Sequence, residues 1–141
     1  MSIDLTVHLK KLSVGSASLD TLRAAQVISF QKNGELVHLT RNRPRREKEL
    51  LDGGSIYWII KGAIIARQLI LGLRDHRRID GTPVCGLVLD TNLVRVTATP
   101  VRIFQGWRYL EVVDAPSDLN AGQDSDMPEE LISELRDLGI F

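Results

Sequence analysis

The sequence has few of the features that mark membrane, secreted or metal-binding proteins. Its 141 residues include one cysteine, Cys85, which excludes an intrachain disulfide and a zinc site built from several cysteines. The longest apolar runs, Ile56–Ile60 and Ala63–Ala66, fall far short of the roughly 20 residues that span a bilayer. Residues 1–5 contain neither a basic segment nor an apolar core, so no cleaved secretory signal is expected. We therefore expect a soluble, cytoplasmic protein without a membrane partner.

Spacings that hold metals or catalytic groups are also missing. The three histidines, His8, His38 and His76, form no HExxH motif, and no CxxC or GxxxxGK[ST] motif is present. Cys85 lies in an apolar, β-branched segment, where we expect a buried and unreactive thiol. The sequence therefore predicts no metal site and no cofactor, and it assigns no catalytic residue.

The zero net charge hides a strong asymmetry along the chain. Residues 1–110 carry 17 basic and 9 acidic side chains, a net of +8, whereas residues 111–141 carry one basic and nine acidic side chains, a net of −8. This pattern is typical of a basic body that meets an anionic partner and an acidic tail that partly screens it. An acidic tail that only improves solubility is the alternative.

Periodicity and turn residues predict about six strands and three helices. The first helix is expected to begin after Ser18, to bury Leu19, Leu22, Ala25 and Ile28, and to end at Asn33-Gly34. A short helix is expected to begin at Pro44 and to stop at Gly53-Gly54, and a third to cover 128–138. Asp80-Gly81 predicts a hairpin turn. The strands, about six in number, are expected among seven candidate segments, 5–12, 36–40, 55–61, 67–74, 84–89, 93–97 and 106–113.

This order of elements predicts an α+β domain over residues 1–119. Its sheet would be mixed or antiparallel and would curl toward a small β-barrel. Residues 114–126 are rich in turn-forming residues and predict a linker, so residues 120–141 would form an acidic linker and a C-terminal amphipathic helix.

Four segments of the chain carry a resemblance to a known family: residues 7–12 (VHLKKL), 49–62 (ELLDGGSIYWIIKG), 66–68 (ARQ) and 104–110 (FQGWRYL). They resemble a family of small alphaproteobacterial proteins, domain of unknown function 1489. The resemblance covers about residues 4–119 and implies no catalytic or binding residue. The order of strands and hairpins is also similar to the PUA/ASCH group of RNA-associated domains, which implies a PUA-like barrel.

An arginine cluster around Pro44 is the strongest candidate site, comprising Arg41, Arg43, Arg45 and Arg46. Proline favours an extended residue before it, so Arg41 and Arg43 are expected to point the same way. Arg45 and Arg46 would lie in the first turn of a helix, where cations are unfavourable unless an anion also binds. The alternative is that Arg45 pairs with Glu49 while Arg41 and Arg43 are solvated.

Aromatic residues beside cations extend this candidate site. Trp107 and Tyr109 are expected to share one face of a strand and Arg108 to lie on the other, a combination that suits the stacking of single-stranded nucleic acid. Trp107 could instead belong to the core, as we expect for Trp58. Further arginines, Arg74, Arg77 and Arg78, precede the predicted hairpin.

The leading functional prediction is a non-catalytic, arginine-rich module that binds nucleic acid, most naturally RNA. The first alternative is a small enzyme acting on an anionic or nucleotide-like substrate, with Lys61, Arg67 and Gln68 lining its pocket. The second is a protein-binding adaptor whose terminal helix docks through Leu131, Leu135 and Leu138. The candidate binding residues are Arg41, Arg43, Arg45, Arg46, Lys61, Arg67, Trp107, Arg108 and Tyr109.

Overall fold

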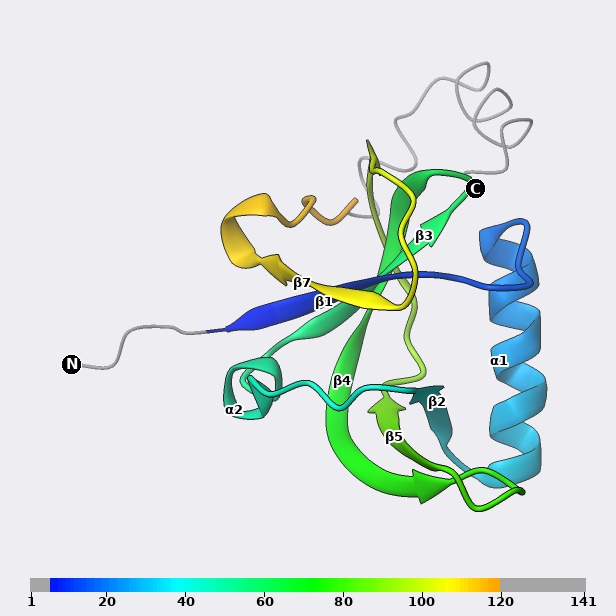
Figure 1. Ribbon diagram of the computed structural model, residues 1–141. Coiled ribbons are helices and arrows are strands. Elements are labelled where there is room, and N and C mark those ends of the chain that lie inside the picture. Colours follow the sequence, from blue (N-terminus) through cyan, green and yellow to red (C-terminus); the bar gives the residue numbers. More distant parts are fainter. Residues whose placement is uncertain (1–5, 120–141) are drawn as a thin grey trace.

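The computed structural model describes residues 6–119. The linker beyond residue 119 and the third helix, predicted at 128–138, lie outside this range. The described chain has seven strands and two α-helices (Figure 1). They are β1 (Val7–Leu12), α1 (Leu19–Asn33), β2 (Leu36–Thr40), α2 (Glu47–Leu50), β3 (Ser55–Ile60), β4 (Ala63–Arg77), β5 (Pro83–Leu89), β6 (Val94–Pro100) and β7 (Trp107–Glu111), followed by the 3-10 turn η1 (Val112–Asp114).

The strands form one mixed sheet, as expected for the α+β class. Their order is β2-β5-β4-β3-β1-β7, and β6 pairs with β4 beside this path. The β1–β3 pair is parallel and the other pairs are antiparallel. The sheet is open within residues 6–119, with β2 and β7 at its two ends, so it does not close into the small PUA-like barrel toward which it was predicted to curl.

Strand β4 explains why the sheet bends without closing. Its first half pairs with β3 and β6, whereas its second half pairs with β5. The register shifts between Ile70 and Gly72, and β4 follows a curved path at this end of the sheet (Figure 1). The prediction of a strand over 67–74 was too short, because Gly62 forms the preceding turn at φ 81° and Gly72 sits in the bend without ending the strand.

Local turn and cap signals are confirmed. The Ser18 side chain caps α1 by accepting the Thr21 N–H at 3.1 Å, and Gly34 ends the helix at φ 75°. The Asp80-Gly81 turn connects β4 to β5, with Gly81 at φ 88°. Each of these features depends only on residues close together in the chain.

Helix α1 packs on the sheet only through its N-terminal part. Leu19 and Leu22 are buried as predicted, but Ala25 is exposed and Ile28 is 66% exposed. The expected burial of these two residues is wrong: Ala25 lines an open chamber, and Ile28 lies on the exposed part of the helix. Neither helix within residues 6–119 has the length and apolar character needed to cross a bilayer.

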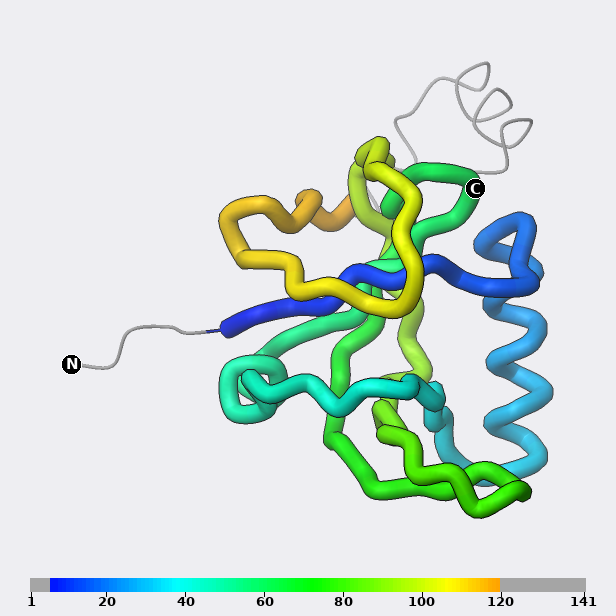
Figure 2. Tube along the Cα trace, viewed as in Figure 1, coloured from blue at the N-terminus to red at the C-terminus, as the bar shows by residue number. Residues whose placement is uncertain are grey.

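The short helix α2 begins later than predicted. It starts at Glu47 and not at Pro44, so Arg45 and Arg46 precede it and lie outside its first turn. Residues 41–46 form an irregular connection between β2 and α2 (Figure 2). Gly53, at φ 85°, follows α2 as expected.

Residues 117–119 pair with β6, so the first part of the linker predicted at 114–126 belongs to the folded body.

Strand register places charged and aromatic residues on two distinct faces. Lys11 of β1 lies opposite Trp107 of β7 and beside Trp58 of β3, so these three side chains share one face. That face carries the larger core, which includes Trp58 and is flanked by Trp107 and Tyr109. The opposite face carries the neighbouring row, Arg108, Lys10, Tyr57 and Arg67.

Candidate nucleic-acid interface

Three adjoining depressions form a groove on the face that carries Trp107. The first, here called the arginine pocket, has a volume of about 610 Å³ and shares the lining residues Asn42 and Trp107 with the second. The second, the cationic pocket, has a volume of about 290 Å³. It shares Lys11, Leu39 and Arg78 with the third, the chamber of about 590 Å³ beneath α1. Each depression shares lining residues with the next, so the three lie side by side between the arginine cluster and α1.

The aromatic side chains of β7 hold the 41–46 connection in place. The Trp107 indole N–H donates to the carbonyl oxygen of Asn42 at 3.0 Å, and the Arg46 backbone N–H donates to the Tyr109 hydroxyl at 3.0 Å. The two rings meet edge to face, 4.9 Å between centroids. Trp107 and Tyr109 therefore share a face, as predicted, and line the arginine pocket.

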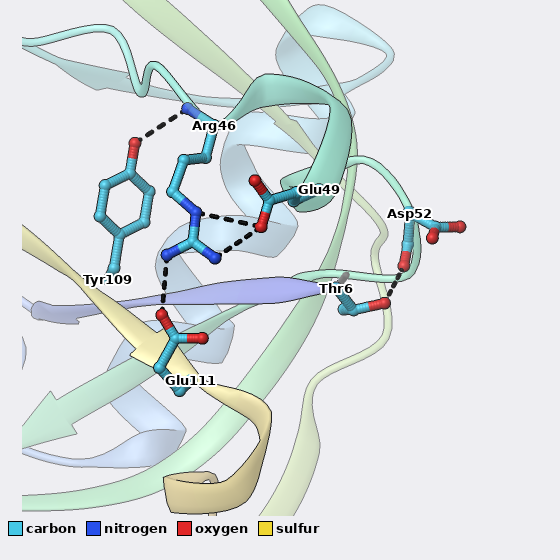
Figure 3. A network of polar contacts seen from close by, with 6 residues as sticks. All are labelled: Thr6, Arg46, Glu49, Asp52, Tyr109 and Glu111. Atoms are coloured by element: carbon cyan, nitrogen blue, oxygen red, sulfur yellow. Dashed lines mark hydrogen bonds and ion pairs between the residues drawn. The ribbon is translucent and has the colours of Figure 1, made fainter. Parts of the chain in front are cut away.

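Arg46 is the centre of a polar network (Figure 3). Its guanidinium donates to Glu49 at 3.1 and 2.5 Å and to Glu111 at 2.7 Å. The same group lies 5.2 Å from the centre of the Tyr109 ring. These hydrogen bonds raise the pKa of Arg46 and lower the pKa of Glu49. Arg46 thus joins the 41–46 connection to β7 and makes the pairing with Glu49 that was considered for Arg45.

The remaining arginines of the cluster divide into a paired and an unpaired set. Arg43 contacts Glu47 at 2.8 Å and Asp75 at 2.8 Å, so it ties the connection to α2 and to β4. Arg41 and Arg45 form no ion pair with any residue in 6–119. The structure therefore brings the four arginines together, with two used in internal contacts and two open to a ligand.

The cationic pocket combines three positive side chains, and no carboxylate of residues 6–119 lines it. Lys11 comes from β1, Arg41 follows β2, and Arg78 stands in the β4–β5 hairpin. The hairpin holds Arg78 through its backbone N–H, which donates to the carbonyl of Thr82 at 2.9 Å. Partial burial lowers the pKa of Lys11, because loss of solvent disfavours the charged form of its amine. A bound anion would stabilise that charged form.

The sequence did not identify Lys11 as a site residue and placed Arg78 only among additional arginines. Lys11 belongs to the site because β1 pairs with β7 in the register that sets it opposite Trp107. Alternation within residues 5–12 gave only the facing direction of Lys11, not its neighbour across the sheet. Arg78 lines the cationic pocket because the β4–β5 hairpin, with its Asp80-Gly81 turn, carries it there.

Three predicted site residues lie away from the groove. Arg67 forms a two-point ion pair with Asp118, at 2.7 and 2.6 Å, on the opposite face of the sheet. The Arg108 guanidinium on that face lies 4.8 Å from the centre of the Phe104 ring. Lys61 sits in the β3–β4 turn at φ 51°. None of the three lines the arginine pocket, the cationic pocket or the chamber.

Metal-ligating groups do not gather in the described part of the chain: within residues 6–119, no three His, Cys, Asp or Glu side chains are placed to hold an ion.

No curated protein and no solved structure matches the chain significantly. The model of the family described as "Protein of unknown function (DUF1489)" matches residues 9–141, which is nearly the whole chain. The chain therefore belongs to the DUF1489 family.

Proposed function

We propose that the protein is a non-catalytic, cytoplasmic RNA-binding module that holds a single strand along the groove. The observation that carries this proposal is the convergence of Lys11, Arg41 and Arg78 on one concave surface beside Trp107. Cations that share a depression with no carboxylate repel one another, and phosphate groups relieve that repulsion. Arginine adds planar donors that fit phosphate oxygens in pairs.

The neighbouring arginine pocket supports a chain-like ligand over a single anion. Arg45 and the rings of Trp107 and Tyr109 continue the cationic and aromatic character beyond the cationic pocket. Single-stranded nucleic acid is bound by this combination, with backbone phosphates near cations and bases near aromatic side chains. The two adjoining pockets therefore favour successive nucleotides of RNA as the ligand.

Salt dependence of binding tests the proposal. Fluorescence anisotropy would measure the affinity for a labelled single-stranded RNA of about 12 nucleotides over a series of salt concentrations. The double variant Arg41→Gln/Arg78→Gln should flatten the slope of log K against log salt by about 1.4, since each phosphate contact on a single strand contributes about 0.7. The matched control Arg23→Gln/Arg102→Gln removes the same charge from exposed residues outside the groove lining and should keep the slope.

Equal slopes for the groove variant and the wild type would remove these cations from the binding site and contradict the proposal. Binding of mononucleotides with no detectable binding of RNA would also contradict it. That second result would favour the enzyme acting on a nucleotide-like substrate.

A further inference from the structure

The chamber beneath α1 has the size and lining of a small-molecule site. Its volume of about 590 Å³ lies within the range of about 300–1,000 Å³ typical of such sites. Helix α1 contributes Leu22, Ala25 and Gln26, and the sheet contributes His38 of β2 and Trp58 of β3. The lining mixes apolar residues with nearly as many polar ones and includes the ring of Trp58, a combination that suits a flat, partly polar ring.

A buried hydrogen-bond network fixes the direction of the polar groups at the chamber. Gln68 is 0% exposed, and its side-chain oxygen accepts the donor-only indole N–H of Trp58 at 2.8 Å. Its amide nitrogen donates to the carbonyl of Asp90 at 3.0 Å. These two partners fix the orientation of the Gln68 amide, because the indole N–H only donates and the carbonyl only accepts.

Gln68 in turn fixes Gln26 at the chamber wall. The two amides exchange reciprocal hydrogen bonds of 2.8 Å, Gln26 Nε2 to Gln68 Oε1 and Gln68 Nε2 to Gln26 Oε1. Gln68 then has all four of its hydrogen-bonding positions filled, whereas Gln26 has used one N–H and one lone pair. Gln26 keeps one donor and one acceptor for a ligand, on a side chain that is already held in place.

His38 adds a second polar group to the same chamber. Its Nε2 atom is buried and has no hydrogen-bond partner among residues 6–119. The ring meets Trp58 edge to face, with centroids 5.1 Å apart. Burial and the nearby charge of Lys11 lower the pKa of His38 to about 4, so the ring is neutral near pH 7. This nitrogen has no exposed surface, so a ligand in the chamber would reach it only after a rotation of the ring. An unsatisfied buried nitrogen is costly, and such a contact would satisfy it.

We infer that the chamber accepts an unstacked base of the bound nucleotide while the adjoining cationic pocket holds its phosphate. Lys11, Leu39 and Arg78 line both spaces, so the two spaces adjoin and the parts of one nucleotide would lie on either side of these residues. A nucleotide joins a flat ring with polar edges to an anionic group, which matches a chamber bearing Gln26 and His38 beside a pocket of three cations. This inference rests on the proposed function and adds to it a base-dependent contact.

Removing the bases from the ligand tests the inference. Wild-type protein would be titrated with a single-stranded RNA of about 12 nucleotides and with the fully abasic ribose-phosphate chain of equal length. The base-containing strand should bind about tenfold more tightly, since one stacked base contributes roughly one or two factors of ten. Adenosine 5′-monophosphate and ribose 5-phosphate, titrated in parallel, show whether a free nucleotide suffices.

Filling the chamber should remove this difference. Ala25→Trp, on the exposed side of α1 that lines the chamber, should reduce binding of the RNA about tenfold and leave binding of the abasic chain unchanged. Val27→Trp is the matched control, because Val27 is half-exposed on α1 but does not line the chamber. Gln26→Ala provides a second variant that opens the chamber without crowding it, and it should weaken only the base-containing ligands.

The outcomes separate the two claims. Equal affinity of wild-type protein for the RNA and the abasic chain would overturn base recognition while leaving phosphate binding along the groove intact. Full RNA affinity in both Ala25→Trp and Gln26→Ala would overturn it as well. Failure of wild-type protein to bind any of the four ligands would overturn the proposed function itself.

Discussion

Replacing Gln68 with leucine removes the group that organises the buried network while keeping a similar side-chain volume. The substitution leaves the indole N–H of Trp58 without its 2.8 Å acceptor, and Trp58 is only 2% exposed. The carbonyl of Asp90 loses its 3.0 Å donor as well. Gln26 is less affected, because it lines a chamber open to solvent.

The size of the effect follows from the buried indole. Leaving one buried donor unsatisfied costs about 1–3 kcal/mol, and the added apolar volume of leucine offsets part of the remaining loss. We expect Gln68→Leu to lower the free energy of unfolding by about 2 kcal/mol. For a folded body of this size, with an unfolding entropy of about 2.1 cal/mol/K per residue, Tm should fall by about 8 °C.

A double-mutant cycle with Trp58→Phe isolates the hydrogen bond. Phenylalanine removes the indole donor, so Gln68→Leu should cost about 1 kcal/mol less in the Trp58→Phe background than in the wild type. Urea unfolding followed by circular dichroism measures all four proteins. Additive losses, or a Gln68→Leu variant as stable as the wild type, would contradict the role given to this network.

Three further expectations concern stability and the tail. The pKa of His38 is about 4 in the folded protein and about 6.5 in the unfolded protein, so between these pH values only the unfolded state binds the extra proton. The free energy of unfolding should therefore fall by about 3 kcal/mol as pH drops from 6.5 to 4. Urea unfolding should show a smaller pH dependence in His38→Phe, and an unchanged dependence would refute the assignment. Gly54→Ala should destabilise the fold by about 3 kcal/mol, because a Cβ there would lie 2.2 Å from the backbone oxygen of Leu50 and 2.3 Å from that of Val7. An unchanged Tm would show that this close approach is absent. Truncation at Asn120 removes a segment with a net charge of −5 and should tighten RNA binding, most strongly at low salt. Equal RNA affinities of the full-length and truncated proteins at about 0.05 M salt would argue against screening by the tail.

The sequence was most informative where structure depends on neighbouring residues. The cap at Ser18, the stop at Gly34 and the Asp80-Gly81 hairpin each rest on contacts within a few positions. The parallel β1–β3 pairing and the double use of β4 depend on partners far apart in the chain, so local patterns could not predict the open sheet.

The candidate site was predicted in part for the same reason. The arginine cluster is visible in the sequence itself, and the shared face of Trp107 and Tyr109 follows from strand alternation; both line the groove. The helix start at Pro44, which would have placed Arg45 and Arg46 in a first turn, was not borne out. The internal partners of Arg43 and Arg46 could not be foreseen, because Asp75 and Glu111 reach them from distant strands. Lys11 joined the site only through the register of β1 with β7.

Both tryptophans of the chain line the groove, which makes their indole N–H groups direct reporters of ligand position. In a two-dimensional ¹H–¹⁵N spectrum, addition of single-stranded RNA should shift the indole signals of Trp107, in the cationic pocket, and Trp58, at the chamber. Backbone signals of Lys10 and Tyr57, whose side chains lie on the opposite face, should move less. Unchanged indole signals, with the larger shifts on the opposite face, would contradict RNA binding in the groove.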